Sequence, residues 1–350
     1  MNSKIAISIL FVFAQFLVGS QQGNAQTRPL VTKAQEGPAQ DSVATVQTET
    51  QIRQTLESFR KINDHPLFEM SFHGGYIADP PKKVSELPAS KNVRWACSIF
   101  VSYGPDDSAI YGRNFDWQHN PALLLHTNPP NAYASISMVD ISYLGFELKD
   151  KKFKTIEGRK ALLAAPLLPF DGMNEHGLTI GMAAVGETKI PSNPNKQNVG
   201  SLQVIRLMLD RARTVNEAIK VFTEFNIQNS GGPNSHYLIA DVDGNSALIE
   251  LKDDKTNIIR GNKNWQSATN FYLTDQDKPL LQCRRFAQIN QVMTDNRGIL
   301  TVDQTFNLLK NVSQRNTQWS VVYDMTNRFA HVTTDRNFGQ RTKIRVKKTN

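Results

Sequence analysis

The pattern of apolar and polar positions along the chain predicts alternating runs of strands and helices. Residues 97–103 (CSIFVSY) and 108–115 (SAIYGRNF) are rich in β-branched and aromatic side chains, as strands are. Gly104-Pro105-Asp106-Asp107 between them is turn chemistry, so a hairpin is expected. The other stretches with strand character are 121–127, 134–142, 178–185, 236–242, 246–252, 266–273, 319–324 and 328–333.

Helical spacing of apolar residues appears in a second set of segments. These expected helices are 50–62, 201–213, 214–226, 280–294 and 302–313. Thr214 is an N-cap candidate, and Glu217 three residues later would complete a capping box. Residues 63–94 hold Pro-Pro, Gly-Gly and several charges, so they are expected to be mostly loop. Strands in runs, then helices, then strands again predict an α+β layered domain.

The N-terminus has the three parts of a signal peptide. Lys4 supplies a positive start, the run from Ile5 to Val18 is almost wholly apolar, and Gly23-Asn24-Ala25 offers the small residues of a cleavage site. The apolar run is short for a bilayer span, although an uncleaved anchor is the alternative. We therefore expect residues 1–25 to be a signal peptide. The protein is expected to be secreted or periplasmic and to have no stable membrane span after signal cleavage.

Composition narrows the classes of function. With 350 residues, 39% hydrophobic and 21% charged, the chain is ordinary globular protein rather than a disordered one. The net charge of +8 is dispersed and not interleaved with aromatics, apart from a basic C-terminal cluster, so nucleic-acid binding is not expected. Seven scattered histidines and the absence of CxxC, HxxxH and HExxH patterns argue against a metal site, and no cofactor is expected.

Cys97 is the first candidate for chemistry. It is one of two cysteines, and a lone cysteine is ordinarily a small core residue or half of a disulfide, here with Cys283. The expected hairpin changes this, because it returns Arg113 (113 − 97 = 16 residues later) and Asp116 (116 − 97 = 19) to the start of the first strand. Arg113 would lower the thiol pKa, and Asp116 would hold a nearby amine. The alternative is a surface ion pair, which contributes little energy.

Two further motifs carry polar groups near predicted strand ends. In residues 171–178 (DGMNEHGL) the glycines suit a sharp loop, and Asn174 would offer its amide to a substrate, unless it is simply a turn residue. Asn270 follows the strand that contains Ser267 and would donate to an oxyanion. Arg285, on the next helix, would anchor the site or a substrate carboxylate.

Together these motifs resemble the cysteine N-terminal-nucleophile (Ntn) hydrolases. This group contains the choloylglycine hydrolases, including bile salt hydrolase and penicillin V acylase, the acyl-coenzyme A:6-aminopenicillanate acyltransferases, and the N-acylethanolamine acid amidases. The resemblance covers roughly Trp95 to Val346, and its most specific parts are Cys97 with the GRNFDW hexapeptide (112–117) and DGMNEHGL; the WSVVYD segment at 319–324 also fits. It implies a four-layer αββα sandwich whose nucleophile is exposed by self-cleavage.

Residue by residue, the resemblance implies a catalytic domain at 97–350 and a propeptide at 26–96 that is removed by self-cleavage at Ala96–Cys97. Cys97 would be the nucleophile, Arg113 and Asp116 would position and activate it, Asn270 would be the oxyanion asparagine and Arg285 the active-site arginine. The implied reaction is hydrolysis of a linear, non-peptide C–N amide bond in a small N-acyl substrate. Ala184 stands where bile salt hydrolases have an asparagine, and the segment from Asn270 to Arg285 is short; neither favours bile salts or penicillin V as substrates.

Other functions stay open at this point. An acyltransferase would use the same thioester with an amine in place of water. A secreted, non-enzymatic binding protein would use a Cys97–Cys283 disulfide for stability. A papain-like protease is not favoured, because Cys97 lacks the sequence that surrounds the papain nucleophile. Leu162–Phe170 (LLAAPLLPF) would line an acyl pocket or belong to the core. The sequence does not define the oligomeric state.

Overall fold

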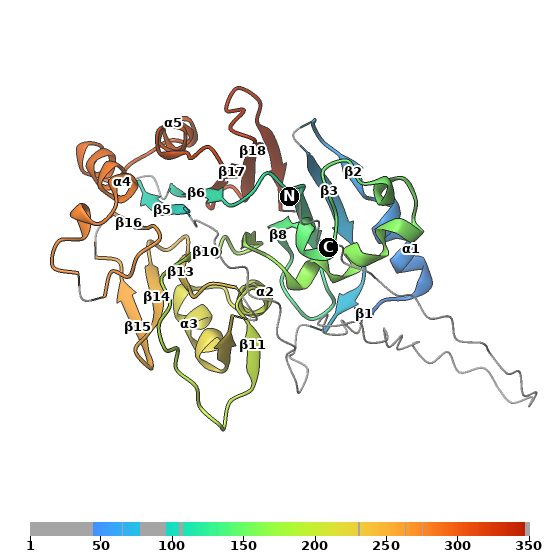
Figure 1. Cartoon of the computed structure of the whole chain (residues 1–350), viewed down its shortest axis with the longest axis horizontal. Helices are drawn as coiled ribbons and strands as arrows, with labels where there is room; N and C mark the ends of the chain where they lie inside the picture. The colour runs from blue at the N-terminus through green and yellow to red at the C-terminus, as the bar shows by residue number, and fades with distance from the viewer. Residues whose placement is uncertain are drawn as a thin grey trace, which may run out of the picture.

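The structure is a computed structural model that describes residues 45–64, 66–77, 96–104, 108–229, 232–262, 264–274 and 276–346. The predicted signal peptide and most of the predicted loop 63–94 lie outside these residues. Two large β-sheets stack face to face, and a pair of helices covers the outer face of each (Figure 1). This is the α+β, four-layer αββα arrangement expected above.

The larger sheet has nine strands, and every neighbouring pair except β3–β7 is antiparallel. Its strands, in order across the sheet, are β15 (Lys255–Arg260), β14 (Ser246–Lys252), β13 (Ser235–Ala240), β10 (Thr179–Ala184), β9 (Asp171–Asn174), β8 (Ser135–Asp140), β7 (Ala122–Thr127), β3 (Leu67–Phe72) and β2 (Arg60–Lys61). The helices α2 (Gln203–Arg211) and α3 (Val215–Thr223) pack on β9, β10 and β13.

The smaller sheet carries the predicted hairpin near its edge. Its strands, in order, are β16 (Trp265–Ala268), β5 (Ser98–Tyr103), β6 (Ala109–Asp116), β17 (Thr317–Asp324), β18 (Phe329–Thr334) and β19 (Thr342–Arg345). The helices α4 (Arg284–Asp295) and α5 (Val302–Val312) cover its outer face. Two short pairs complete the described strands: β1 (Thr45–Val46) with β4 (Gly75–Tyr76), and β11 (Asn198–Gly200) with β12 (Asn226–Gln228).

Burial explains why β5 is apolar along nearly its whole length. Ile99 and Val101 face the core between the sheets, while Phe100 packs among the residues of α4 and α5 on the other face. A strand covered on both faces has no solvent side for polar residues, so it reads as a continuous apolar run. The turn at Asp243-Gly244-Asn245 is likewise as expected, with Gly244 at a φ of +86°.

The capping box predicted at Thr214 is only half formed. The Thr214 side chain accepts from the backbone N–H of Glu217, as expected. The Glu217 carboxylate, however, accepts from the backbone N–H of Arg213 at 2.7 Å, one residue before the cap. The cap therefore stabilises the start of α3 through one of its two predicted bonds.

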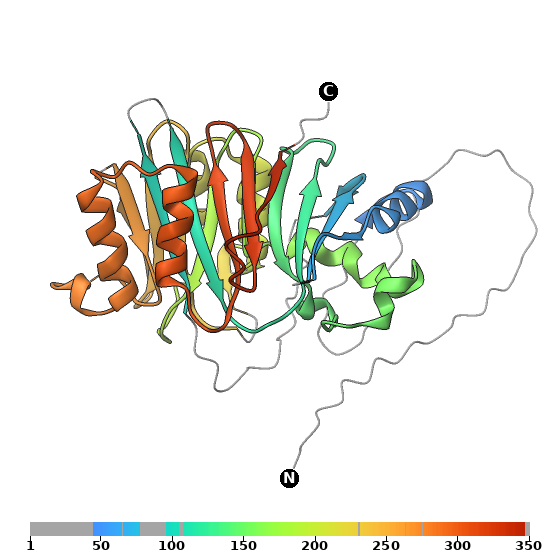
Figure 2. The same ribbon diagram turned by 90° about the horizontal axis from the view of Figure 1, so that it is seen from above.

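The segment before Cys97 departs most from the sequence expectation. The predicted helix is present as α1 (Glu49–Glu57), but part of the expected loop is strand β3, which pairs in parallel with β7 from Leu67↔Ala122 to Phe72↔Thr127. Four 3₁₀ helices also occur in the described residues: η1 (Ile141–Leu144), η2 (Lys151–Lys154), η3 (Glu157–Leu167) and η4 (Pro279–Leu281). The N-terminal segment, blue in Figures 1 and 2, thus extends the larger sheet at the end far from α4.

None of the helices in the described residues is long and apolar enough to cross a membrane.

Candidate active site

Cys97 lies immediately before β5, at the end of the hairpin where β6 finishes. The β5–β6 register pairs Ser98 with Asn114 and Ile99 with Arg113, so Asp116 returns beside the nucleophile candidate. A backbone hydrogen bond links Asp116 to the Cys97 thiol. Cys97 is a free thiol and only 2% exposed. The juxtaposition expected from the spacing of 16 and 19 residues is therefore present.

The electrostatic surroundings of the thiol are mixed. Burial raises the pKa of Cys97, and this is the largest effect. The Arg113 guanidinium opposes it, the Asp116 carboxyl adds to it, and the Asp116 backbone and Arg285 lower the pKa again. Arg113 acts in the direction that the sequence suggested, but in the uncut chain the pKa of the thiol is raised overall.

Asp116 is a fully buried carboxyl with one oxygen still unmatched. Its Oδ1 accepts a hydrogen bond from the Thr317 hydroxyl on the neighbouring strand β17. Its Oδ2 is buried and has no hydrogen-bond partner among the described residues. Burial, partly offset by Thr317 and by the nearby arginines, raises the pKa of Asp116 to about 7. A buried carboxylate oxygen without a donor is costly, and this cost favours the protonated form of Asp116.

Arg113 is also fully buried and crosses from one sheet to the other. Its Nη1 lies 3.1 Å from Asp171 Oδ2 and donates to the Phe170 carbonyl oxygen. Asp171 also accepts from Trp319 Nε1 at 3.1 Å and from the Tyr323 hydroxyl at 2.5 Å. Burial raises the pKa of Asp171, and Arg113 and these donors counteract it. The Arg113–Asp171 ion pair therefore holds the guanidinium between the hairpin and the opposite sheet.

Asp171 is not among the predicted site residues, although it is the first residue of the DGMNEHGL motif. An aspartate at the start of a fully buried strand was the available signal, because a buried carboxylate needs a charged or donating partner.

Asn270 and Arg285 hold the backbone of Cys97. The Cys97 N–H donates to Asn270 Oδ1 at 2.5 Å, and Arg285 Nη2 donates to the same oxygen at 3.0 Å. Arg285 Nη1 donates to the Cys97 carbonyl oxygen and, at 3.0 Å, to Ser98 Oγ. Both predicted residues therefore meet Cys97, although they come from the loop after β16 and from the first turn of α4. The Cys97 N–H belongs to the peptide bond that self-cleavage would cut.

The donor side of Asn270 faces the opposite sheet. Its Nδ2 donates to the Ala184 carbonyl oxygen at 2.8 Å. An amide nitrogen carries two hydrogens, so this bond occupies only one of them. Ala184, which stands where bile salt hydrolases have an asparagine, thus takes part through its backbone carbonyl, as an acceptor.

Asn174 is placed differently from the other site candidates. Its Oδ1 accepts from the backbone of His176 and Leu178, and its Nδ2 donates to the carbonyl oxygens of Leu209 and Ala212. These four bonds use every donor and acceptor position of a primary amide, and the side chain is fully buried. The geometry supports the turn alternative: Asn174 joins its loop to the end of α2 and has no group left for a substrate.

Other predicted features belong to the packing. In the apolar segment 162–170, Leu162 and Ala165 lie in the core beside β3 and β7, and Phe170 packs at an angle against Phe115 and edge-on against Trp319. Cys283 is a free, half-buried thiol at the N-cap of α4, and no disulfide joins it to Cys97. No group of three or more His, Cys, Asp or Glu side chains that would suit a metal ion occurs in the part of the chain described here.

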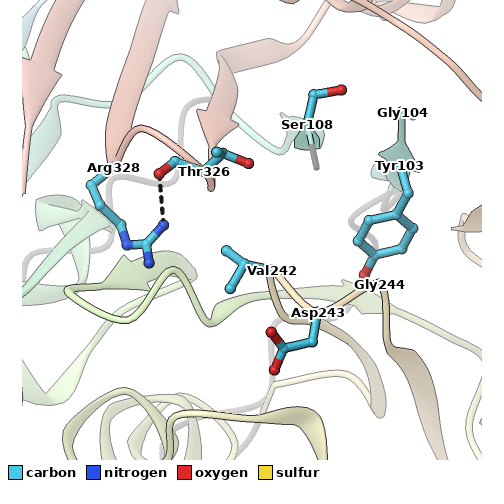
Figure 3. Close-up of a pocket in the computed structure, with 8 residues that line it drawn as sticks. All are labelled: Tyr103, Gly104, Ser108, Val242, Asp243, Gly244, Thr326 and Arg328. Atoms are coloured by element: carbon cyan, nitrogen blue, oxygen red, sulfur yellow. Dashed lines mark hydrogen bonds between the residues drawn. The ribbon is translucent and has the colours of Figure 1, made fainter. Parts of the chain in front are cut away.

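A groove of about 500 Å³ lies away from these residues (Figure 3). Its lining comes from three hairpin turns: Tyr103, Gly104 and Ser108; Val242, Asp243 and Gly244; Thr326 and Arg328. Tyr103 is the last residue of β5, whereas Cys97 precedes the first, so the groove is at the opposite end of the sandwich from the nucleophile candidate. None of the predicted site residues lines it.

In this chain a cysteine at the start of β5, the second strand from the sheet edge, is held by asparagine and arginine side chains. The two stacked sheets, each covered by a pair of helices, form an Ntn-hydrolase fold. Solved structures with this arrangement include penicillin V acylase from Agrobacterium tumefaciens, at 19% identity and a TM-score of 0.50, covering 68% of this chain and 83% of that one. A variant of conjugated bile acid hydrolase from Clostridium perfringens matches at 17% identity and a TM-score of 0.52, covering 73% and 93%. At such identities the similarity concerns the fold.

The chain belongs to the acyl-coenzyme A:6-aminopenicillanic acid acyl-transferase family, whose model matches residues 103–338. That match contains Arg113, Asp116, Asn270 and Arg285, and it begins after Cys97. No curated protein matches the sequence. The family and the fold confirm the resemblance given above.

Proposed function

We propose that this protein is a self-processing amidase that cleaves linear C–N amide bonds of small N-acyl substrates with Cys97 as its N-terminal nucleophile. The observation that supports this most is the bond from the Cys97 N–H to Asn270 Oδ1, with the unmatched Oδ2 of Asp116 beside the same residue. Asn270 holds the nitrogen that cleavage at Ala96–Cys97 would free, and the buried Asp116 carboxyl is close enough to Cys97 to act on its thiol pKa.

Self-cleavage would begin at the thiol. The Cys97 Sγ attacks the Ala96 carbonyl carbon, the C–N bond breaks as the nitrogen takes a proton, and a thioester replaces the peptide bond. Water then hydrolyses the thioester and leaves residues up to Ala96 with a carboxylate. The new α-amine has an ordinary pKa near 8, so it is largely an ammonium at pH 7, and Asp116 would pair with it.

Turnover would use the same residue as nucleophile and base. The neutral fraction of the amine takes the thiol proton, and the thiolate attacks the substrate carbonyl carbon. The second Nδ2 hydrogen of Asn270 and a backbone amide would stabilise the oxyanion. The ammonium then protonates the leaving amine, and water hydrolyses the acyl-enzyme. Arg285 would keep the Cys97 backbone in position through its carbonyl oxygen.

The family match supports a second candidate, acyl transfer, in which an amine in place of water takes the acyl group from the thioester. The two reactions share every step up to the acyl-enzyme. Product analysis with and without a competing amine separates them: a transferase forms a new amide in proportion to the added amine. We further propose that the protein acts outside the cytoplasm after removal of residues 1–25, on the strength of the signal-like N-terminus.

The experiment is intact mass and N-terminal sequencing of the purified protein beside two variants. The wild type and Cys283→Ala should begin a chain at Cys97, whereas Cys97→Ala should keep residues 26–96 joined to the rest. Cys283→Ala is the matched control, because it removes the other thiol. A wild type that stays joined at Ala96–Cys97 at both neutral and mildly acidic pH would refute the free-amine mechanism.

A further inference from the structure

A buried His236–Glu250 pair lies behind the loop that presents Asn270. His236 on β13 and Glu250 on β14 face each other in the strand register, and His236 Nδ1 lies 3.2 Å from Glu250 Oε1. Both side chains are fully buried. Neighbouring Tyr237 packs on Phe222 of α3, so His236, one residue along the strand, points to the opposite face, between the two sheets.

Glu250 collects its other hydrogen bonds from the loop after Asn270. Its Oε1 accepts from the Leu273 N–H at 2.7 Å. Its Oε2 accepts from the Thr274 N–H at 2.9 Å and from the Thr274 hydroxyl at 2.5 Å. A carboxylate that accepts several such bonds is strongly held in its charged form. Burial acts to raise the pKa of Glu250, but the bonds from His236, Thr274 and Leu273 outweigh it and lower the pKa.

The loop has no regular structure of its own to fix Asn270. Strand β16 ends at Ala268, and residues 269–274 form neither helix nor strand. The loop is fixed by its side chains and by Glu250: Phe271 packs edge-on against Phe286 at 5.1 Å, and the Tyr272 hydroxyl donates to the Gly186 carbonyl oxygen at 3.0 Å. Glu250 makes three bonds to two consecutive residues of the loop, Leu273 and Thr274, whereas Arg285 contacts the loop at Asn270 itself.

We propose that Glu250, which is held by its hydrogen bond to His236, is a positioning residue that fixes the loop carrying Asn270 and so keeps Asn270 in contact with Cys97. This inference rests on the proposed amidase function for its kinetic test. Asn270 holds the Cys97 nitrogen at 2.5 Å and offers its second Nδ2 hydrogen to an oxyanion, so small displacements of the loop affect both contacts. Catalysis is sensitive to such errors: a misplacement of about 1 Å costs about 100-fold in rate.

The chain contains a matched control for this pair. Glu69 on β3 and His126 on β7 form a second carboxylate–imidazole pair at 2.9 Å in the same sheet. Three strands, β10, β9 and β8, separate β13 from β7 and β3, the two strands that carry this second pair. Glu69→Gln therefore removes the same chemical interaction without touching the Asn270 loop.

The test is a double-mutant cycle between Glu250 and Asn270. It compares the rates at which each variant hydrolyses an N-acyl amide that the wild type accepts, expressed per titrated Cys97 thiol. Glu250→Gln keeps the shape of the side chain but places an N–H₂ group against donors of Leu273 or Thr274. We expect kcat to fall about 100-fold with little change in KM, because a displaced Asn270 stabilises the transition state less well. Glu69→Gln should stay within about 3-fold of the wild type. In an Asn270→Ala background Glu250→Gln should add less than about 3-fold, because the two residues act through one contact.

Equal losses from Glu250→Gln with and without Asn270 would overturn the proposal, as would an unchanged kcat. If Glu250→Gln does not fold, Thr274→Val removes one of the three loop bonds and should show the same dependence on Asn270 at about 10-fold or less. If the wild type turns over no amide, the proposed function fails, and hydrogen exchange still tests the anchor. Glu250→Gln, unlike Glu69→Gln, should then speed exchange in the peptide spanning 269–274, and equal protection would refute the anchor itself.

Discussion

Asp116→Asn should stabilise the uncut protein at alkaline pH while impairing its function. Asp116 is buried, and its pKa is raised from 3.8 to about 7. In the unfolded chain the carboxyl has its ordinary pKa, so the folded state binds the proton more tightly. Folding is then favoured at low pH, and stability is lost as pH rises towards 7. Asparagine does not ionise, and its Oδ1 can still accept from Thr317.

The magnitude follows from the two pKa values. Their difference of about 3 (7 − 3.8), at about 1.4 kcal/mol for each pKa unit, gives an upper bound of about 4 kcal/mol for the cost of the buried charge above pH 7. Below pH 3.8 both states are protonated and the cost disappears. From pH 5 to pH 8 the free energy of unfolding of the wild type should fall by about 3 kcal/mol, nearly all of it between pH 5 and pH 7.

The assay is denaturant unfolding of the Cys97→Ala protein, with and without Asp116→Asn, at pH 5 and pH 8. The unmatched amide N–H₂ of the asparagine adds a cost that does not depend on pH, so the comparison is the change between the two pH values. The free energy of unfolding of the asparagine variant should gain about 3 kcal/mol on its parent from pH 5 to pH 8.

Asp150→Asn is a control at a carboxyl whose pKa is shifted in the opposite direction. Burial acts to raise the pKa of Asp150, but hydrogen bonds from Lys152 and Glu147 outweigh it and lower the pKa. The stabilisation from a lowered pKa is fully present above pH 3.8 and is lost only below it, so Asp150→Asn should differ from its parent by the same amount at pH 5 and at pH 8. A pH-independent difference for Asp116→Asn would refute the assignment of a raised pKa. In the Cys97-containing protein the same substitution should slow the proposed turnover, because the α-amine that cleavage would free loses the carboxyl that would hold it.

Three other outcomes are expected. After cleavage, the fragment ending at Ala96 should co-elute with the rest of the protein on size exclusion and separate only in denaturant; early separation would contradict this. Arg285→Lys should slow self-cleavage about 100-fold in a mass-resolved time course, because an ammonium cannot span the Cys97 carbonyl and Asn270 as a guanidinium does. Gly181→Ala should destabilise by about 1–3 kcal/mol in denaturant unfolding, since the added Cβ would lie 2.7 Å from the Tyr111 hydroxyl; an unchanged midpoint would show that the sheets yield there.

The sequence predicted the site best where the chemistry is local. Cys97, Arg113 and Asp116 lie on one hairpin, so their spacing and a turn are enough to place them together. Asn270 and Arg285 come from distant segments, and only the family resemblance indicated that they meet Cys97. Asn174 shows what a motif cannot distinguish. Its asparagine and the nearby glycine suit a turn as well as a binding site, and all the bonds of its side chain go to backbone groups of the protein.

The missed elements have physical causes. Strand β3 pairs in parallel with β7 across more than fifty residues of sequence, a contact that no local pattern reveals. Strand β15 is at the edge of the sheet and largely exposed, so Lys255, Thr256 and Asn257 give it a polar sequence that does not read as a strand. Helix η3 contains Pro166 and lacks the spacing of an amphipathic α-helix.

The position of β3 gives the segment before Cys97 a structural role in the larger sheet. A purely inhibitory leader would block the amine and then leave, but this one also supplies a strand with six paired residues and the buried side chains Phe68, Met70 and Phe72. Its loss would uncover the apolar face of β7 and turn a paired strand into an open edge. Tyr76 adds a bond of 2.8 Å to Asp210 on α2. The proposed cut at Ala96–Cys97 would free the amine without removing any of these contacts, so activation by cleavage and retention of the segment are compatible. The stability of the cleaved protein would then depend on both chains.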